Sequence, residues 1–144
     1  MTTTQEQLTQ TFNNNFVAYY RAHVAHVNIL GRNFVSDHKL LQGIYERRQE
    51  QIDRLAELLR TLDEYMPCEI QDVLNQSEIG TGIFEEDADG FLYGVKDDLE
   101  HLKGTYEGLM AVAEKEGHEE IANYAQDQIL DLAKSIWMLS ATLS

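Results

Sequence analysis

Four residues in the first half of the chain have the side chains and the spacing of a metal site. They are two histidines and two acids, His26, His38, Asp53 and Glu57. Imidazole nitrogens and carboxylate oxygens together suit iron, zinc or manganese. At about 100° of helical turn per residue, His38, Asp53 and Glu57 fall within one arc of about 100° on a single predicted helix. The pattern therefore predicts three ligands on one helical face.

A single helix cannot deliver these three ligands to one ion. His38 and Asp53 are 15 residues apart, which is a rise of roughly 22 Å along a helix axis. A second copy of the chain running antiparallel places His38 of one copy beside Asp53 of the other, which is the geometry of a two-fold interface. We therefore expect the metal site to lie between subunits.

His26 fits the same arrangement, because it lies near the end of the preceding predicted helix. Residues 31–35 have the composition of a tight turn, and folding back about this turn places His26 near residue 38 or 39. The histidines would then come from one chain, and Asp53 and Glu57 from its partner. Any one of these residues alone is more simply a solvated or hydrogen-bonded side chain, so it is the four together that favour a metal site.

The predicted elements that position these residues are helical. Apolar residues recur with helical spacing over 5–30, 34–63, 91–116 and 119–143, and over a short segment at 68–76. Gly31, Pro67 and Gly117 mark expected helix ends. One long connection between the second and third long helices predicts an all-α, ferritin-like four-helix bundle with a short helix in that connection. The sequence lacks the Glu-x-x-His pattern that binds metal inside such bundles, which again favours a site between chains.

The chain resembles the Dps-type mini-ferritins at the same positions. The segment from His26 to His38 resembles that family's signature, in which a histidine is followed by Asn, Gly and Phe and by a second histidine twelve residues on. The run from Asp53 to Glu57 resembles the family's Asp-x-x-Ala-Glu, and residues 134–139 resemble its last helix. The resemblance implies that these four residues are the metal ligands and catalytic residues of an iron site at a two-fold interface.

The resemblance also implies an activity and an assembly. The expected function is oxidation of Fe(II) to Fe(III) by a ferroxidase-type oxidoreductase, with hydrogen peroxide as the expected oxidant. The ferric product would be stored as mineral in a hollow homo-dodecamer, which protects against oxidative damage. Twelve subunits of 16.5 kDa give a particle of about 198 kDa.

The sequence departs from the family pattern at two positions. Val27 stands where the family usually has a Trp beside the iron site, and Gln42 stands where it often has an acidic residue. Gln is a neutral and weaker iron ligand than a carboxylate, so the second iron position is expected to be weak. These departures favour the alternative of a catalytically weakened shell with a structural or protective role. Tyr19, Tyr20 or Tyr45 are candidates to replace the missing Trp.

One further histidine lies close to the expected site. His23 precedes His26 by three residues, one helical turn away. It is either a residue that supports the metal ligands without binding the metal itself or, more simply, a polar residue at a subunit contact.

Composition limits the remaining functions. The 144 residues, with one Pro, one Cys and no long apolar run, predict a single domain over 1–144 with no disulfide framework and no membrane span. The N-terminus lacks the regions of a signal peptide, so a cytoplasmic location is expected. The net charge is −14, and the first twenty residues contain no Lys or Arg. The family that the chain resembles usually binds DNA through a tail rich in Lys and Arg, so DNA binding is not expected here at neutral pH.

Overall fold

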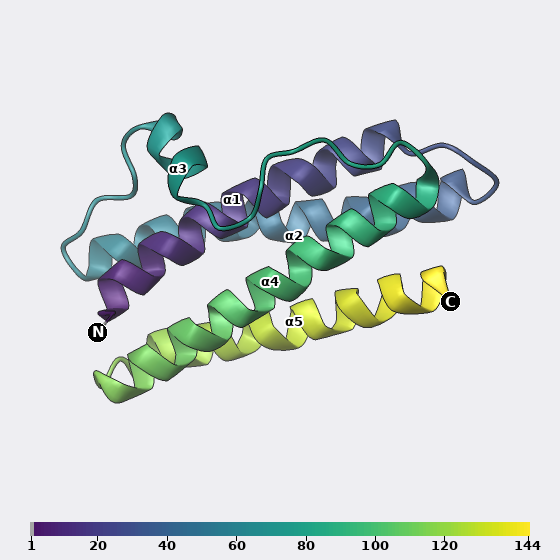
Figure 1. Ribbon diagram of the computed structural model, residues 1–144. Coiled ribbons are helices and arrows are strands. Elements are labelled where there is room, and N and C mark those ends of the chain that lie inside the picture. The colour runs from purple at the N-terminus through teal and green to yellow at the C-terminus, as the bar shows by residue number, and fades with distance from the viewer. Residues whose placement is uncertain (1) are drawn as a thin grey trace.

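The computed structural model describes residues 2–144, and the regular elements in that range are all helical. The elements, shown in Figure 1, are α1 (Thr4–Asn28), α2 (Phe34–Thr61), α3 (Ile70–Gln76), α4 (Ala88–Lys115) and α5 (Glu119–Leu143). This confirms the all-α bundle of four long helices with a short helix in the long connection. Met1, with which the expected domain begins, lies outside the described residues. Along residues 2–144 no helix is both long enough and apolar enough to cross a bilayer.

The four long helices form two antiparallel hairpins that share one core. α1 lies along α2, α4 lies along α5, and α1 also packs against α4 (Figure 1). The apolar stripes that face the core include Leu8, Phe12, Leu41, Leu55, Leu102, Leu109, Leu132 and Leu139. Each such side chain stabilises the fold by about 1.5–3 kcal/mol when it is fully buried. Packing of these stripes therefore holds the bundle together more than helix propensity does.

Specific backbone interactions fix several helix ends. At the start of α1, the Thr3 hydroxyl accepts from the Glu6 amide and the Glu6 carboxylate accepts from the Thr3 amide, which is a capping box. At the end of α4, the His118 amide donates to the Ala113 carbonyl at 2.8 Å, and Gly117 has a φ of 82°. The last pattern is a Schellman ending, which favours glycine at the residue with positive φ. It confirms Gly117 as the residue that ends this helix.

The end of α2 differs from the expectation. The helix stops at Thr61, so Pro67 is not what ends it. The Glu64 amide donates to the Leu59 carbonyl at 3.0 Å, and Asp63 has a φ of 62°. A left-handed residue after the helix satisfies its last carbonyls from within the chain. The expectation placed the end on Pro67 because an aspartate in this conformation has no strong sequence signal.

The long connection from α2 to α4 lies along α1 (Figure 1). α3 packs against α1, and Arg21 of α1 holds the segment that follows α3. The Arg21 Nε lies 2.6 Å from a carboxylate oxygen of Asp98 on α4, and its Nη1 donates to the carbonyl of Gly82. The guanidinium also lies 4.1 Å from the centre of the Phe84 ring. One side chain thus ties the connection to α1 and α4.

Candidate metal centre

The turn between α1 and α2 brings His26 and His38 into contact. Their rings stack with centroids 3.8 Å apart and planes at 15° to one another. Nδ1 of His26 lies 2.7 Å from the carbonyl oxygen of His38, and Nδ1 of His38 lies 2.7 Å from the carbonyl oxygen of His26. The structure therefore confirms that the chain folds back so that these two histidines lie side by side.

The two reciprocal hydrogen bonds fix the tautomer of both neutral rings. A carbonyl oxygen only accepts, so each Nδ1 carries the hydrogen and each Nε2 keeps a free lone pair. A histidine that binds a metal usually donates its other ring N–H to a carbonyl or a carboxylate, which orients the ring. His26 and His38 thus have the hydrogen-bonding arrangement of metal ligands that bind through Nε2.

Aromatic side chains hold the histidine pair in place. His26 is 7% exposed, and the ring of Tyr45 lies 5.0 Å from it. His38 is half-buried, and Phe34 stacks on it with centroids 4.9 Å apart. The pair is therefore rigidly packed on its inner side, and only His38 keeps appreciable contact with solvent.

Asp53 and Glu57 lie elsewhere on the same helix. Both side chains are exposed, and α2 is continuous over Phe34–Thr61, so Asp53 stands roughly 22 Å of helix rise beyond His38. Within residues 2–144, no group of three or more His, Cys, Asp or Glu side chains is placed to hold a metal ion. A single chain thus brings together the histidines but not the carboxylates.

The interior of the bundle carries a buried cation of its own. The guanidinium of Arg48, which is 1% exposed, donates to Asp131 at 2.7 Å and to the Gln128 amide oxygen at 3.1 Å. The Arg48 carbonyl accepts from the Asn15 amide group at 2.8 Å. A buried charge is tolerated when it is paired and hydrogen-bonded in this way. These partners from α1 and α5 fill the bundle centre, which agrees with a metal site outside it.

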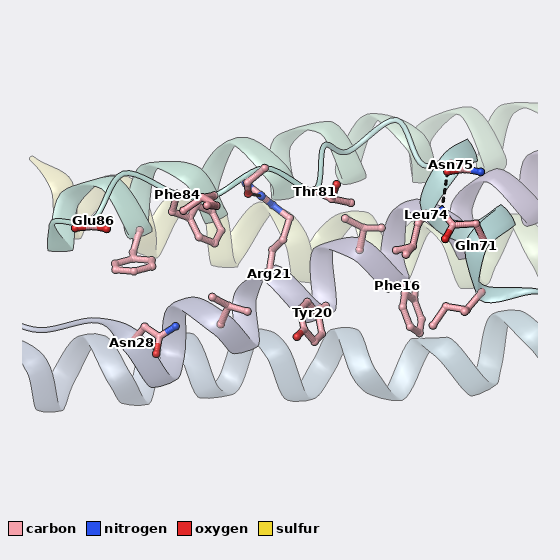
Figure 2. A pocket seen from close by; sticks show the side chains of 16 residues that line it. Phe16, Tyr20, Arg21, Asn28, Gln71, Leu74, Asn75, Thr81, Phe84 and Glu86 are labelled. Atoms are coloured by element: carbon pink, nitrogen blue, oxygen red, sulfur yellow. Dashed lines mark hydrogen bonds between the residues drawn. The ribbon is translucent and has the colours of Figure 1, made fainter.

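A second candidate site is a groove of about 970 Å³ on another face of α1, beneath the long connection (Figure 2). Its walls include Tyr20 of α1, Leu74 of α3 and Phe84 of the segment before α4. Arg21 is the basic residue in its lining, and it is already paired with Asp98. The groove has the size of a small-molecule site, but its described lining does not pair titratable groups for catalysis. The histidine pair is the stronger candidate.

Comparison with known proteins identifies the family of the chain. A family model of the ferritin-like domain matches residues 5–144. A Helicobacter pylori protein named DNA protection during starvation protein is 31% identical over 132 residues, which cover 89% of this chain and 90% of that protein. The chain is a Dps-type mini-ferritin of the ferritin-like family. The antigen TpF1 of Treponema pallidum is another relative of the mini-ferritin, 32% identical over 96% of this chain and 78% of its own length.

Solved structures share the mini-ferritin fold over nearly the whole chain. The Dps protein of Vibrio cholerae superposes with a TM-score of 0.92 and 26% identity, covering 98% of this chain and 89% of its own, and is described as a ferritin-like diiron-carboxylate protein. The CAIP protein of Helicobacter cinaedi gives a TM-score of 0.90 and 29% identity, covering 98% of this chain and 99% of its own. The mini-ferritin thus shares its fold with these proteins over nearly the whole of its chain.

The sequence did not reveal how the other aromatic residues lie beside the histidine pair of the mini-ferritin. The ring of His23 stacks on Tyr45 with centroids 4.0 Å apart and planes at 7°, whereas its expected place at a subunit contact stays a prediction. Its Nδ1 also lies 3.1 Å from the hydroxyl of Tyr19. The sequence does indicate that Tyr45 lies on the same side of the helix as His38, because it follows His38 by seven residues, which is two helical turns.

Proposed function

We propose that this mini-ferritin pairs about a two-fold axis and forms an iron site at each end of the pairing surface. His26 and His38 supply neutral nitrogen ligands, and the carboxylates are Asp53 of the partner subunit and Glu57 of the partner subunit. Fe(II) is the substrate, hydrogen peroxide is the oxidant, and ferric mineral is stored in a hollow dodecamer of about 198 kDa. The proposed role is a cytoplasmic ferroxidase that limits oxidative damage.

The observation that carries this proposal is the reciprocal hydrogen bonding of His26 and His38. It leaves two free Nε2 lone pairs beside one another, with no carboxylate from the described part of the same chain to complete the ligand set. The exposed Asp53 and Glu57 lie on the same helix, where an antiparallel α2 of a second subunit presents them. Anionic oxygens favour the more highly charged ferric product over Fe(II), and Glu57 is the expected bridge between two iron ions.

Exposed apolar side chains next to the histidines support an interface at this place. Val27, Leu30 and Val35 are 60%, 76% and 63% exposed and surround the turn between α1 and α2. Apolar side chains that gather on a surface mark sites where another molecule packs. Burial of this patch by a second subunit would stabilise the same pairing that completes the iron site.

The alternative is a shell whose iron site is weakened. Gln42, one turn after His38, donates from its amide to Glu46 at 2.8 Å, so a neutral group stands where a carboxylate would strengthen a second iron position. Val27 is aliphatic and mostly exposed, and it cannot be oxidised as a Trp can. In this alternative the particle assembles and protects, but Fe(II) oxidation is slow.

Assembly and iron binding are tested on the same purified protein. Size-exclusion chromatography with light scattering should give a particle near 200 kDa at neutral pH, because one chain does not gather the ligands. Anaerobic titration should then show Fe(II) binding, and ferric absorbance should appear when peroxide is added. A stable monomer would overturn the interface site, and an assembled particle with slow oxidation would favour the weakened shell.

A double variant assigns the ligands. Replacing Asp53 and Glu57 with Ala should remove fast Fe(II) oxidation and leave the particle assembled, because these carboxylates repel one another when no metal is bound. The matched control replaces two exposed acids of α4, Glu107 and Glu114, and should oxidise iron as the wild type does. Rapid oxidation by the Asp53/Glu57 variant would place the iron site elsewhere.

A further inference from the structure

A histidine and a glutamate face one another at a distance from the proposed iron site. Nε2 of His101, on α4, lies 3.6 Å from a carboxylate oxygen of Glu78, in the segment that follows α3. Both side chains are about half exposed, at 48% and 55%. Gln10 of α1 lines the same pocket and precedes His26 by 16 residues, a rise of roughly 24 Å along the helix. His101 and Glu78 therefore form a cluster separate from the histidine pair.

The separation of these two atoms suits two ligands of one metal ion better than it suits a hydrogen bond. A hydrogen bond between nitrogen and oxygen is roughly 2.7–3.2 Å long. Zinc binds an imidazole nitrogen and a carboxylate oxygen at about 2.0–2.2 Å, so two such ligands at a tetrahedral angle stand roughly 3.4 Å apart. The observed 3.6 Å between His101 and Glu78 therefore lets one ion contact both atoms with little movement of either side chain.

A buried asparagine holds both residues in place. Asn14 of α1 is 0% exposed, and its amide nitrogen donates to the same Glu78 carboxylate oxygen at 3.0 Å. Its amide oxygen accepts from the Glu78 backbone amide at 2.8 Å. The amide nitrogen also donates to the Thr105 hydroxyl at 2.9 Å, and that hydroxyl donates to the His101 carbonyl at 3.1 Å. One buried side chain thus orients the two candidate ligands, as the hydrogen-bonding partners of metal ligands do.

The pocket beside the two residues has room for a hydrated cation. Its volume is about 420 Å³, and it is lined in part by Gly104, where an added Cβ would have no atom within 4 Å. Glu100 also lines it, which adds negative charge, but the Glu100 carboxylate is paired with Lys96 at 2.7 Å. Two side chains are thus available as ligands, and the open space lets water molecules complete the coordination.

We propose that His101 and Glu78 bind a divalent first-row transition cation of the zinc type, with water in the remaining positions. An imidazole nitrogen beside a carboxylate oxygen suits such ions, whereas Mg²⁺ prefers oxygen ligands alone. Among the described residues no third His, Cys, Asp or Glu joins the pair, so binding is reversible. The bound cation links α4 to the segment after α3 and fastens the long connection at a second place besides Arg21.

The test is a Zn²⁺ titration of the assembled, metal-free protein by calorimetry and equilibrium dialysis. Wild type should bind one more Zn²⁺ per subunit than His101→Gln, because any Zn²⁺ at the proposed iron site contributes equally to both. Glu78→Gln keeps an oxygen that accepts from Asn14 but loses the charge, and should weaken this class of site about tenfold or more. His118→Gln, which removes a histidine outside the pocket, should match the wild type.

Hydrogen exchange gives a second readout that does not depend on iron. Zn²⁺ should slow exchange of the backbone amides at 77–79 in the wild type and not in His101→Gln, and Mg²⁺ should have no such effect. Fe(II) oxidation by His101→Gln should equal that of the wild type, which separates this site from the proposed function. If wild type and His101→Gln bind the same number of Zn²⁺ ions with the same affinity, the two side chains form only a surface ion pair and the inference is overturned.

Discussion

At the scale of single residues, the contact between His26 and His38 depends on the short turn that joins α1 and α2. A turn of fixed length between two helices determines which backbone positions face one another, so a spacing of twelve residues was enough to pair the histidines. The stacking of His23 on Tyr45 depends on the register of α1 against α2 and on rotamers. Neither is encoded in a short motif. The ligand role of all four residues stays a prediction, and for Asp53 and Glu57 it also requires a second chain.

Gln42 offers a direct test of the second iron position. Replacing it with Asp adds a carboxylate one turn from His38, and we expect a second Fe(II) to bind about tenfold more tightly, equal to roughly 1.4 kcal/mol. Anaerobic titration measures the stoichiometry and the affinity. Gln126→Asp, an exposed position on α5, is the control. Unchanged binding in Gln42→Asp would show that residue 42 does not face the metal.

At the scale of helices, the sequence predicted the existence of each element better than its ends. Apolar periodicity located all four long helices because each buries one stripe in a common core. The end of α2 was missed because Asp63 adopts a left-handed conformation. That conformation depends on hydrogen bonds such as the one from the Glu64 amide to the Leu59 carbonyl, where the chain turns after the helix. The anchoring of the long connection by Arg21 was also missed, since Asp98 lies 77 residues away.

Asp63 gives a stability prediction at this scale. A non-glycine residue with a φ of 62° is strained, whereas glycine adopts this conformation readily. Asp63→Gly should raise the free energy of unfolding by about 0.5–1 kcal/mol, after the greater freedom of glycine in the unfolded chain is counted. Denaturant unfolding at fixed protein concentration measures it. Glu64→Gly, one residue on, should be neutral or destabilising, and the same sign in both variants would contradict the explanation.

The Arg21–Asp98 pair predicts a pH dependence. Burial raises the pKa of Asp98 to about 6, although the hydrogen bond and charge of Arg21 oppose the shift. A carboxyl with a pKa above its unfolded value of 3.8 stabilises the fold when protonated. That contribution is complete below about pH 4 and is lost as the pH rises through about 6.

Comparison with a neutral side chain isolates this effect. The free energy of unfolding of the wild type, minus that of Asp98→Asn, should fall between about pH 4 and pH 6, by at most about 3 kcal/mol. Denaturant unfolding at a series of pH values gives the difference. Glu114→Gln, at an exposed position farther along α4 that is not among the charges acting on Asp98, provides the control, and its difference should change less over the same pH range. A flat difference for Asp98→Asn would mean that this carboxyl is not shifted.

At the scale of the whole molecule, charge decides the expected behaviour toward nucleic acid. Each chain carries 11 basic and 25 acidic residues, for a net charge of −14. Protein–DNA affinity depends on Lys and Arg that neutralise phosphates and release counterions. Relatives from Helicobacter pylori, Brevibacillus brevis and Bacillus anthracis are named for DNA protection, but the first Lys or Arg of this chain is Arg21. A particle built from such chains should repel DNA, so any protection would come from removal of iron and peroxide.

A gel-shift experiment checks this expectation. Duplex DNA should not be retarded at neutral pH, physiological salt and with a chelator present. Retardation in acid is compatible with the same reasoning, because protonation of carboxylates and histidines removes the repulsion. Binding at neutral pH that weakens as salt is added would contradict the prediction and restore DNA binding to the function.

The buried Arg48 has a consequence for how the protein is supplied with iron. Its positive charge is covalently part of the chain and cannot be chelated or lost, and it occupies the bundle together with Asp131 and Gln128. Proteins whose folding is coupled to a metal unfold when the metal is removed. Here the polar side chains at the centre of the bundle are paired with one another instead. Under the proposed iron storage, we expect subunits to fold and accumulate during iron shortage, so that storage capacity is made before iron arrives.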